Sequence, residues 1–334
     1  MPSPISDPVR PNVLDARPSV VILRPLGLGD FLTGLPAYRA VARAFPNHHK
    51  VLAAPVVFQP LARLCGGIDE LVDTLPLLPV HPRLRHADVA IDLHGKGPES
   101  HRILLAAQPR RLIAFENALI AESTGQAQWN QDEHEVARWC RLLIHNGIHA
   151  DCEDLDLQLP TVPVSKPGKG ATLLHPGAAS ESRRWPIERW IEIARAEQRR
   201  GHRVVITGSH HEIARARRIA QRAAIPQKNV YAGRTTLAQL ASLVANAARV
   251  VCGDTGIAHL ATAFRIPSVV LFGPTNPKHW GPPQSRSYHQ VLWHGEIGDP
   301  HAESVDCGLA NITVEQVLAG LDRLSSAGAQ HQAS

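Results

Sequence analysis

The chain has 334 residues, of which 44% are hydrophobic and 19% are charged, and its formal net charge at pH 7 is +5. This length predicts about two domains, each able to bury its own core, and the composition excludes a disordered or fibrous protein. A basic surface attracts nucleic acid, phosphates, nucleotides or an anionic membrane face. Because aromatic residues are only 4% of the chain, little is available for base stacking, and we expect no nucleic-acid partner.

Residues 1–18 are rich in proline and polar side chains and lack the charged-then-apolar layout of a secretory signal. We expect a flexible arm there and a cytoplasmic protein, because no apolar run approaches the roughly 18 residues that cross a bilayer. The cysteines form no C-x-x-C pair and have no histidine partner at metal-ligand spacing, which predicts no metal site. They are Cys65, Cys140, Cys152, Cys252 and Cys307.

Short apolar runs alternate with helical patterns through residues 19–160, which is typical of βαβ units and a parallel sheet. We therefore predict a Rossmann-like domain over this range. The expected strands are 19–23, 50–54, 88–93 and 111–115, and the clearest helical patterns cover 30–45 and 133–148.

The first expected strand is followed by a loop in which Gly27 and Gly29 allow a tight turn and Asp30 stands at the start of a helix. Asp30 is interpreted in two ways, as a helix N-cap or as a carboxylate available for general-base catalysis at the mouth of a cleft. A dinucleotide site is a third interpretation, which the missing third glycine weakens.

The proline- and glycine-rich segment 161–170 is the best candidate for a linker, and it leads into a second expected Rossmann-like domain over 171–311. The expected strands there are 171–175, 203–207, 229–232, 249–252 and 268–272, with helices over 187–201 and 236–247. Gly201 is a plausible C-cap. The C-terminal segment 312–334 begins with a helical pattern that could pack on either domain.

Three strands of the second domain end in polar, glycine-containing loops that open helices, where free N–H groups bind anions. In "HPGAASESRRWP", Arg183 and Arg184 are either phosphate ligands or a solvated basic turn. Glu212 is either a first-turn carboxylate or an acceptor for a ribose hydroxyl. In "GDTGIAH", Asp254 and Thr255 are N-caps or anion ligands.

His259 follows in the first turn of the same helix, where it could reach the anion or be a packing residue. Because ligands of open α/β sheets bind beyond the carboxyl ends of the strands, these loops together predict a phosphate-bearing ligand in a cleft between the domains.

Four motifs resemble those of glycosyltransferase family 9 over residues 19–324: "LGDFLTGLPA", "HPGAASESRRWP", "GDTGIAHLA" and "FGPTNPKHWGP". The resemblance implies a GT-B fold of two Rossmann-like domains facing a central cleft, with the acceptor mainly on the first and a nucleotide-sugar donor mainly on the second. It implies Asp30 as the general base and Arg183 in place of a lysine that contacts the diphosphate. The other implied donor residues are Ser180, Arg184, Glu212, Thr235, Asp254, Thr255, Gly256 and His259, and the implied acceptor residues are Gly29, His94 and Lys96.

The resemblance implies an inverting glycosyltransferase that needs no metal and no cofactor and that uses ADP-heptose by family default. A glycan or glycolipid would be the acceptor, with peripheral contact to the inner membrane face as a further expectation. Two alternatives stay open: a nucleotide-sugar epimerase on the same frame and a non-catalytic sugar-nucleotide binding protein. The sugar, the nucleotide base, the acceptor and the oligomeric state are not fixed by the residues.

Overall fold

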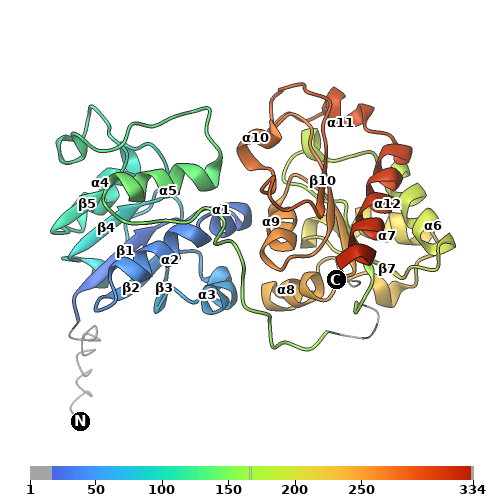
Figure 1. Ribbon diagram of the computed structural model, residues 1–334, viewed down its shortest axis with the longest axis horizontal. Coiled ribbons are helices and arrows are strands. Elements are labelled where there is room, and N and C mark those ends of the chain that lie inside the picture. Colours follow the sequence, from blue (N-terminus) through green and yellow to red (C-terminus); the bar gives the residue numbers. More distant parts are fainter. Residues whose placement is uncertain (1–16, 165, 167, 332–334) are drawn as a thin grey trace, which may run out of the picture.

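The fold is taken from a computed structural model, which describes residues 17–164, 166 and 168–331. Nearly all of the predicted arm, residues 1–18, and two positions of the predicted linker lie outside the described residues. The chain forms two lobes, each built on a parallel sheet of five strands flanked by helices (Figure 1). The first sheet has the order β3-β2-β1-β4-β5 and the second the order β10-β9-β8-β6-β7.

The first sheet has its apolar side chains buried on both faces, as expected for a parallel sheet covered by helices. Val20 and Ile22 of β1 belong to one core cluster, whereas Val21 and Leu23 belong to another. The elements of this lobe are β1 (Ser19–Leu23), α1 (Leu28–Thr33), α2 (Leu35–Ala44), β2 (His49–Ala54), η1 (Val56–Phe58), α3 (Gln59–Cys65), β3 (Glu70–Asp73), η2 (Pro82–Leu84), β4 (Val89–Asp92), α4 (Glu99–Ala106), β5 (Arg111–Ile113), η3 (Ala121–Ser123) and α5 (Glu135–His145).

The second lobe repeats this plan with its own sheet and with the C-terminal helix. Its elements are β6 (Thr172–His175), η4 (Glu181–Arg183), α6 (Ile187–Arg199), β7 (Val204–Ile206), η5 (His210–Glu212), α7 (Ile213–Arg222), η6 (Gln227–Asn229), α8 (Leu237–Ala245), β8 (Arg249–Gly253), α9 (Gly256–Ala263), β9 (Ser268–Leu271), α10 (Pro277–Trp280), β10 (His289–Leu292), α11 (Cys307–Asn311) and α12 (Val314–His331). Gly201, with φ of +81°, ends α6 as predicted.

Two expectations about individual elements were wrong, and two strands were missed. Residues 229–232 are not a strand, because Gln227–Asn229 forms a 3-10 turn and only Val230 makes a bridge, to Ile206. The edge strands β3 and β10 were not predicted, since each is only four residues long and carries polar side chains. The expected helix over 30–45 is two helices, because Pro36 cannot continue α1 and instead starts α2.

The C-terminal helix α12 packs on the second lobe, beside α6, the edge strand β10 and its neighbour β9 (Figure 1). Val317 and Leu321 are fully buried in the core cluster that contains Trp185. The indole nitrogen of Trp185 also donates to the backbone oxygen of Ile312, at 3.0 Å, and fixes the start of this segment. Among the described residues, no helix is long and apolar enough to cross a membrane.

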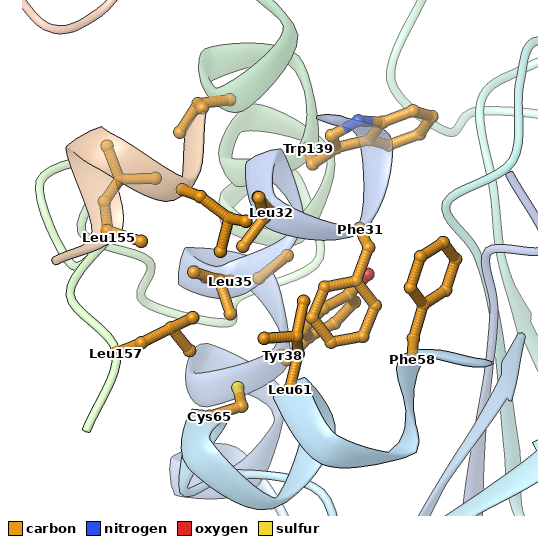
Figure 2. Close-up of a cluster of buried hydrophobic side chains, with 14 of the residues drawn as sticks. Phe31, Leu32, Leu35, Tyr38, Phe58, Leu61, Cys65, Trp139, Leu155 and Leu157 are labelled. Carbon is orange, nitrogen blue, oxygen red and sulfur yellow. The ribbon is translucent and has the colours of Figure 1, made fainter. Parts of the chain in front are cut away.

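The two lobes meet where α1 and α9 lie side by side (Figure 1). A Cβ atom on Gly256 would lie 2.7 Å from the side chain of Leu28, and one on Gly29 would lie 3.2 Å from the ring of His259. One buried cluster continues from the first lobe into the second. Figure 2 shows its part around α1 and α2, where Leu155 and Leu157 of the segment that crosses between the lobes join it.

Candidate active site

A cleft of about 1230 Å³ opens between the lobes, at the carboxyl ends of the strands. Loops after β1, β6, β7, β8 and β9 contribute to it, so the parallel topology gathers segments that are more than 200 residues apart in the sequence. Ten of the thirteen predicted site residues line it: Gly29, Asp30, Arg183, Arg184, Glu212, Thr235, Asp254, Thr255, Gly256 and His259. Ser180, His94 and Lys96 do not.

Asp30 lies in the first turn of α1, and its side chain is 27% exposed at the cleft. One carboxylate oxygen accepts the backbone N–H of Gly27 at 3.1 Å, and the other lies 3.9 Å from the guanidinium of Arg24. Burial raises the pKa of this carboxyl group, and the charge of Arg24 opposes the rise. Asp30 is thus not the N-cap residue, which is Gly27. It is the third residue of α1, and its carboxylate accepts the N–H of the N-cap while also lining the cleft.

Arg24 lies directly after β1 and has no exposed surface. The guanidinium is 4.8 Å from the ring centroid of Trp139, a distance typical of a cation–π contact. It links α1, the residue that follows β4, and α5, and so supports the turn of α1 that carries Asp30. Its hydrogen-bond acceptors are the backbone oxygens of Asp30 (2.5 Å) and Leu93, the hydroxyl of Thr33 (3.0 Å) and the carboxylate of Glu135 (3.0 Å).

Glu135 receives two further donors besides Arg24, from Arg138 and from the indole of Trp139 at 2.8 Å. Burial opposes its ionisation, but Arg24 and Arg138 outweigh burial and hold its pKa below the usual value. The sequence analysis missed this network. An arginine directly after four apolar strand residues was the available signal, because a charge at that place must be buried and paired.

Across the cleft, Asp254, Thr255 and Arg183 come together at the N-terminus of α9. Asp254 is buried, and burial raises its pKa against the opposing effects of Arg183 and of a hydrogen bond from Thr275. Thr255 is the N-cap residue of α9, yet its hydroxyl caps no N–H and is buried without a partner. An unpartnered buried hydroxyl costs free energy, so this group suits a ligand that accepts or donates a hydrogen bond there.

Glu212 forms a capping box, in which its carboxylate accepts the backbone N–H of Ser209 at 2.6 Å. The carboxylate lies against the backbone of the loop after β6, where a Cβ atom on Gly177 would come within 2.0 Å of it. A side chain at position 177 would therefore displace this carboxylate. Next to it, His175 shares a hydrogen bond of 3.0 Å with Thr207, and burial lowers the pKa of this histidine.

His259 contacts the first lobe through Gly29, and its ring lies edge-on to Trp280 at a centroid distance of 6.1 Å. Burial lowers its pKa to about 4, so the imidazole is neutral at neutral pH. It can therefore offer the cleft a hydrogen bond but no positive charge. Thr275 and Trp280 also line the cleft; both lie after β9 in the motif "FGPTNPKHWGP", but neither was named as a site residue.

The three predicted residues outside the cleft have other surroundings. The Ser180 hydroxyl donates to the backbone oxygen of Pro300 and so ties the loop after β6 to the C-terminal loops. His94 follows β4; burial and the charge of Arg24 lower its pKa, and the charge of Asp30 opposes this effect, so His94 is electrostatically coupled to both. Lys96 is exposed in the same loop.

The arrangement separates two chemical tasks. The first lobe offers a carboxylate whose pKa is raised toward neutrality, as a general base requires. The second lobe offers a guanidinium, an unpartnered hydroxyl and a helix N-terminus, which suit an anion. Within the described parts of the chain, no group of three or more histidine, cysteine, aspartate or glutamate side chains could hold a metal ion.

Comparisons with known proteins show the family of this chain. Residues 104–304 match glycosyltransferase family 9 (heptosyltransferase). The chain is 30% identical to lipooligosaccharide heptosyltransferase 2 of Haemophilus influenzae over 92% of this chain and 99% of that protein. It is 25% identical to lipopolysaccharide heptosyltransferase 2 of Escherichia coli over 91% of this chain and 98% of that protein.

Two solved structures have the same GT-B fold. A glycosyl transferase of family 9 from Veillonella parvula superimposes with a TM-score of 0.75 at 19% identity, over 94% of this chain and 99% of that one. The ADP-heptose heptosyltransferase II of Escherichia coli gives 0.72 at 21% identity, over 92% and 98%. The predicted fold class is therefore confirmed.

Proposed function

Because the chain belongs to glycosyltransferase family 9, we propose that it transfers heptose from ADP-heptose to a hydroxyl of a lipopolysaccharide-type glycolipid, with Asp30 as the general base. That the chain is a glycosyltransferase was predicted from its motifs and is confirmed by the family match. The donor and acceptor are those named for its relatives, and the residue roles below are part of the proposal.

The observation that carries the proposal is the division of the cleft. Asp30 comes from the first lobe, whereas Arg183, Thr255 and the N-terminus of α9 come from the second. In this proposal the diphosphate of the donor lies against α9, where Arg183 and the helix N-terminus stabilise its charge and Thr255 gains its missing hydrogen-bond partner. Asp254 accepts hydrogen bonds from hydroxyl groups of the sugar.

Direct displacement at the anomeric carbon requires two charges to be stabilised. The acceptor hydroxyl loses its proton as it attacks, and the leaving diphosphate gains negative charge. Asp30 takes the proton and Arg183 faces the departing diphosphate, so the new bond forms on the side opposite to the one that breaks and the configuration inverts. An ordinary aspartate, with a pKa near 3.9, is a weak base, and the raised pKa of Asp30 brings it closer to this task.

The donor is tested with a thermal-shift panel of ADP-, GDP-, UDP- and dTDP-sugars, followed by incubation of the stabilising donor with truncated lipopolysaccharide. We expect stabilisation by ADP-heptose and a glycolipid product larger by one heptose. Conversion of the donor to an epimer without any acceptor would instead identify an epimerase. Stabilisation without turnover on any acceptor would identify a binding protein. Equal stabilisation by every nucleotide would contradict an ADP-linked donor.

A further inference from the structure

The first lobe carries an exposed apolar surface that the cleft chemistry does not use. Five aliphatic side chains in two loops are each between 51% and 57% exposed. Single exposed leucines are common on soluble proteins, whereas contiguous groups of exposed apolar side chains mark interaction sites. We call this surface the apolar rim, and its members are Val56, Val57, Leu75, Leu77 and Leu78.

The two loops of the apolar rim are neighbours in space. They follow β2 and β3, which pair in parallel with Ala54 beside Asp73. The carboxylate of Asp73 accepts the backbone N–H of Val56 at 2.8 Å, and the N–H of Thr74 donates to Ala54 at 3.1 Å. Both loops leave the carboxyl edge of the first sheet, the edge from which the loops of Asp30 and His94 also depart.

The backbone of the loop after β3 is restricted. Pro76 and Pro79 flank the two central leucines and restrict the backbone, while the N–H of Leu78 closes a turn onto the oxygen of Leu75 at 3.3 Å. Leu77 has φ of +54°, a conformation that residues other than glycine rarely adopt. A strained backbone conformation of this kind persists where the surrounding structure enforces it. Here it occurs in a loop whose leucines are exposed.

We propose that the apolar rim docks the enzyme onto a lipid bilayer, so that the carboxyl edge of the first sheet meets a membrane-embedded acceptor. The proposal rests on the proposed function, because a glycolipid acceptor is what places a membrane at this edge. Residues 55–58 and 74–80 contain no charged side chain, and the adjacent Asp73 carboxylate already accepts the backbone N–H of Val56, so insertion of the five aliphatic side chains brings few charges toward the bilayer. The rim also lacks the tyrosine, tryptophan and arginine that are enriched at protein interfaces.

The charge of the whole chain and one lysine at this sheet edge agree with a bilayer that contains anionic lipid. The chain carries a net charge of +5. Lys96, in the loop after β4 at the same sheet edge, is exposed and has no ion-pair partner among the described residues. Anionic headgroups attract such lysines, whereas the aliphatic side chains of the rim enter the interfacial region below them.

The test is co-sedimentation with vesicles of phosphatidylethanolamine and phosphatidylglycerol, with no donor or acceptor present. We expect the double variant Leu77→Ser, Leu78→Ser to partition at least about tenfold more weakly than the wild type, because two exposed aliphatic anchors are lost. The matched control is Leu159→Ser, which replaces a leucine that is 70% exposed outside the rim and should leave partitioning unchanged. Equal partitioning of all three proteins would overturn the proposal.

Two further measurements distinguish membrane docking from the proposed function and from other binding partners of the apolar rim. Stabilisation by ADP and transfer to a detergent-solubilised acceptor should be unchanged in the double variant, because the rim lies outside the cleft. Vesicle binding that depends on the rim, without any transfer, would leave docking standing and reject the proposed function. A wild-type dimer in gel filtration that becomes a monomer in the double variant would instead assign the rim to a second copy of the chain.

Discussion

Replacement of Arg24 by methionine tests how the buried network supports Asp30. Arg24 has no exposed surface and donates to four oxygens from α1, β4 and α5, so the shorter apolar side chain removes every one of these bonds at once. Glu135 would keep its hydrogen bonds from Arg138 and Trp139. It would lose the charged donor on Oε1, because Arg138 contacts only the other carboxylate oxygen.

The expected loss of stability follows from removing one partner of a buried ion pair. Removing one partner of such a pair costs about 3–5 kcal/mol, and the donors that remain on Glu135 place this variant near the lower end, at about 3 kcal/mol. Adding Glu135→Gln removes the uncompensated carboxylate and should recover about 1–2 kcal/mol. Arg24→Lys keeps the charge but not the planar fork and should lie between the wild type and Arg24→Met.

Urea unfolding at pH 7 measures these free energies, and the pH dependence of turnover measures the effect on Asp30. Burial raises the pKa of Asp30 and Arg24 opposes this rise, so loss of Arg24 should raise the pKa further. The acid limb of the turnover profile should then move to higher pH. A loss below about 1 kcal/mol, strict additivity with Glu135→Gln, or an acid limb that moves to lower pH would refute the reasoning.

Three other predictions concern the buried Asp92 and two residues of the cleft, Gly256 and Thr255. Burial raises the pKa of Asp92 to about 6 from an ordinary value of 3.8, so its ionisation destabilises the fold as the pH rises through this window. Between pH 4 and 6.5, the free energy of unfolding of Asp92→Asn should therefore rise by on the order of 2–3 kcal/mol relative to that of the wild type. A difference in urea unfolding that does not change with pH would contradict this. Gly256→Ala brings a Cβ atom to 2.7 Å from the Leu28 side chain and should lower the stability measured by thermal unfolding by about 1–3 kcal/mol. The control Gly95→Ala, which has no atom within 4 Å of the new Cβ, should lower it by less than half as much. Equal losses of stability would reject the close contact. Thr255→Val removes an unpartnered hydroxyl and should leave the free protein at least as stable while weakening ADP binding about fivefold by calorimetry; unchanged ADP affinity would remove Thr255 from the site.

The fold class could be predicted because both halves alternate apolar runs with amphipathic segments, and long buried strands such as β1 and β8 have strong patterns. The short edge strands β3 and β10 could not, because their partly polar sequences resemble loops. The stretch 229–232 looked like a strand from its composition, but it has only the edge of β7 to pair with and makes a single bridge there. Neighbouring strands, rather than local propensity, decided these elements.

The cleft residues could be predicted because the carboxyl ends of parallel strands meet at one edge, which brings Asp30 and Thr255 into one pocket. Their roles in binding and catalysis remain predictions. Arg24 and Glu135 could not be linked from sequence, since no periodicity relates residues 111 positions apart. The neutral state of His259 also depends on burial between the lobes, which only the folded chain reveals.

The role of Asp30 is tested most directly by comparing donor binding and transfer in Asp30→Asn. Asparagine keeps an oxygen for the N–H of Gly27, so the helix cap survives while the basic carboxylate is lost. We predict that the affinity for ADP-heptose stays within about threefold of the wild type and that single-turnover transfer to truncated lipopolysaccharide falls by about 10²–10⁴-fold. Asp30→Ala should show the same loss of transfer, with a further loss of stability from the missing cap. Transfer at the wild-type rate in Asp30→Asn, or a loss of donor affinity as large as the loss of transfer, would contradict the assignment of Asp30 as the general base.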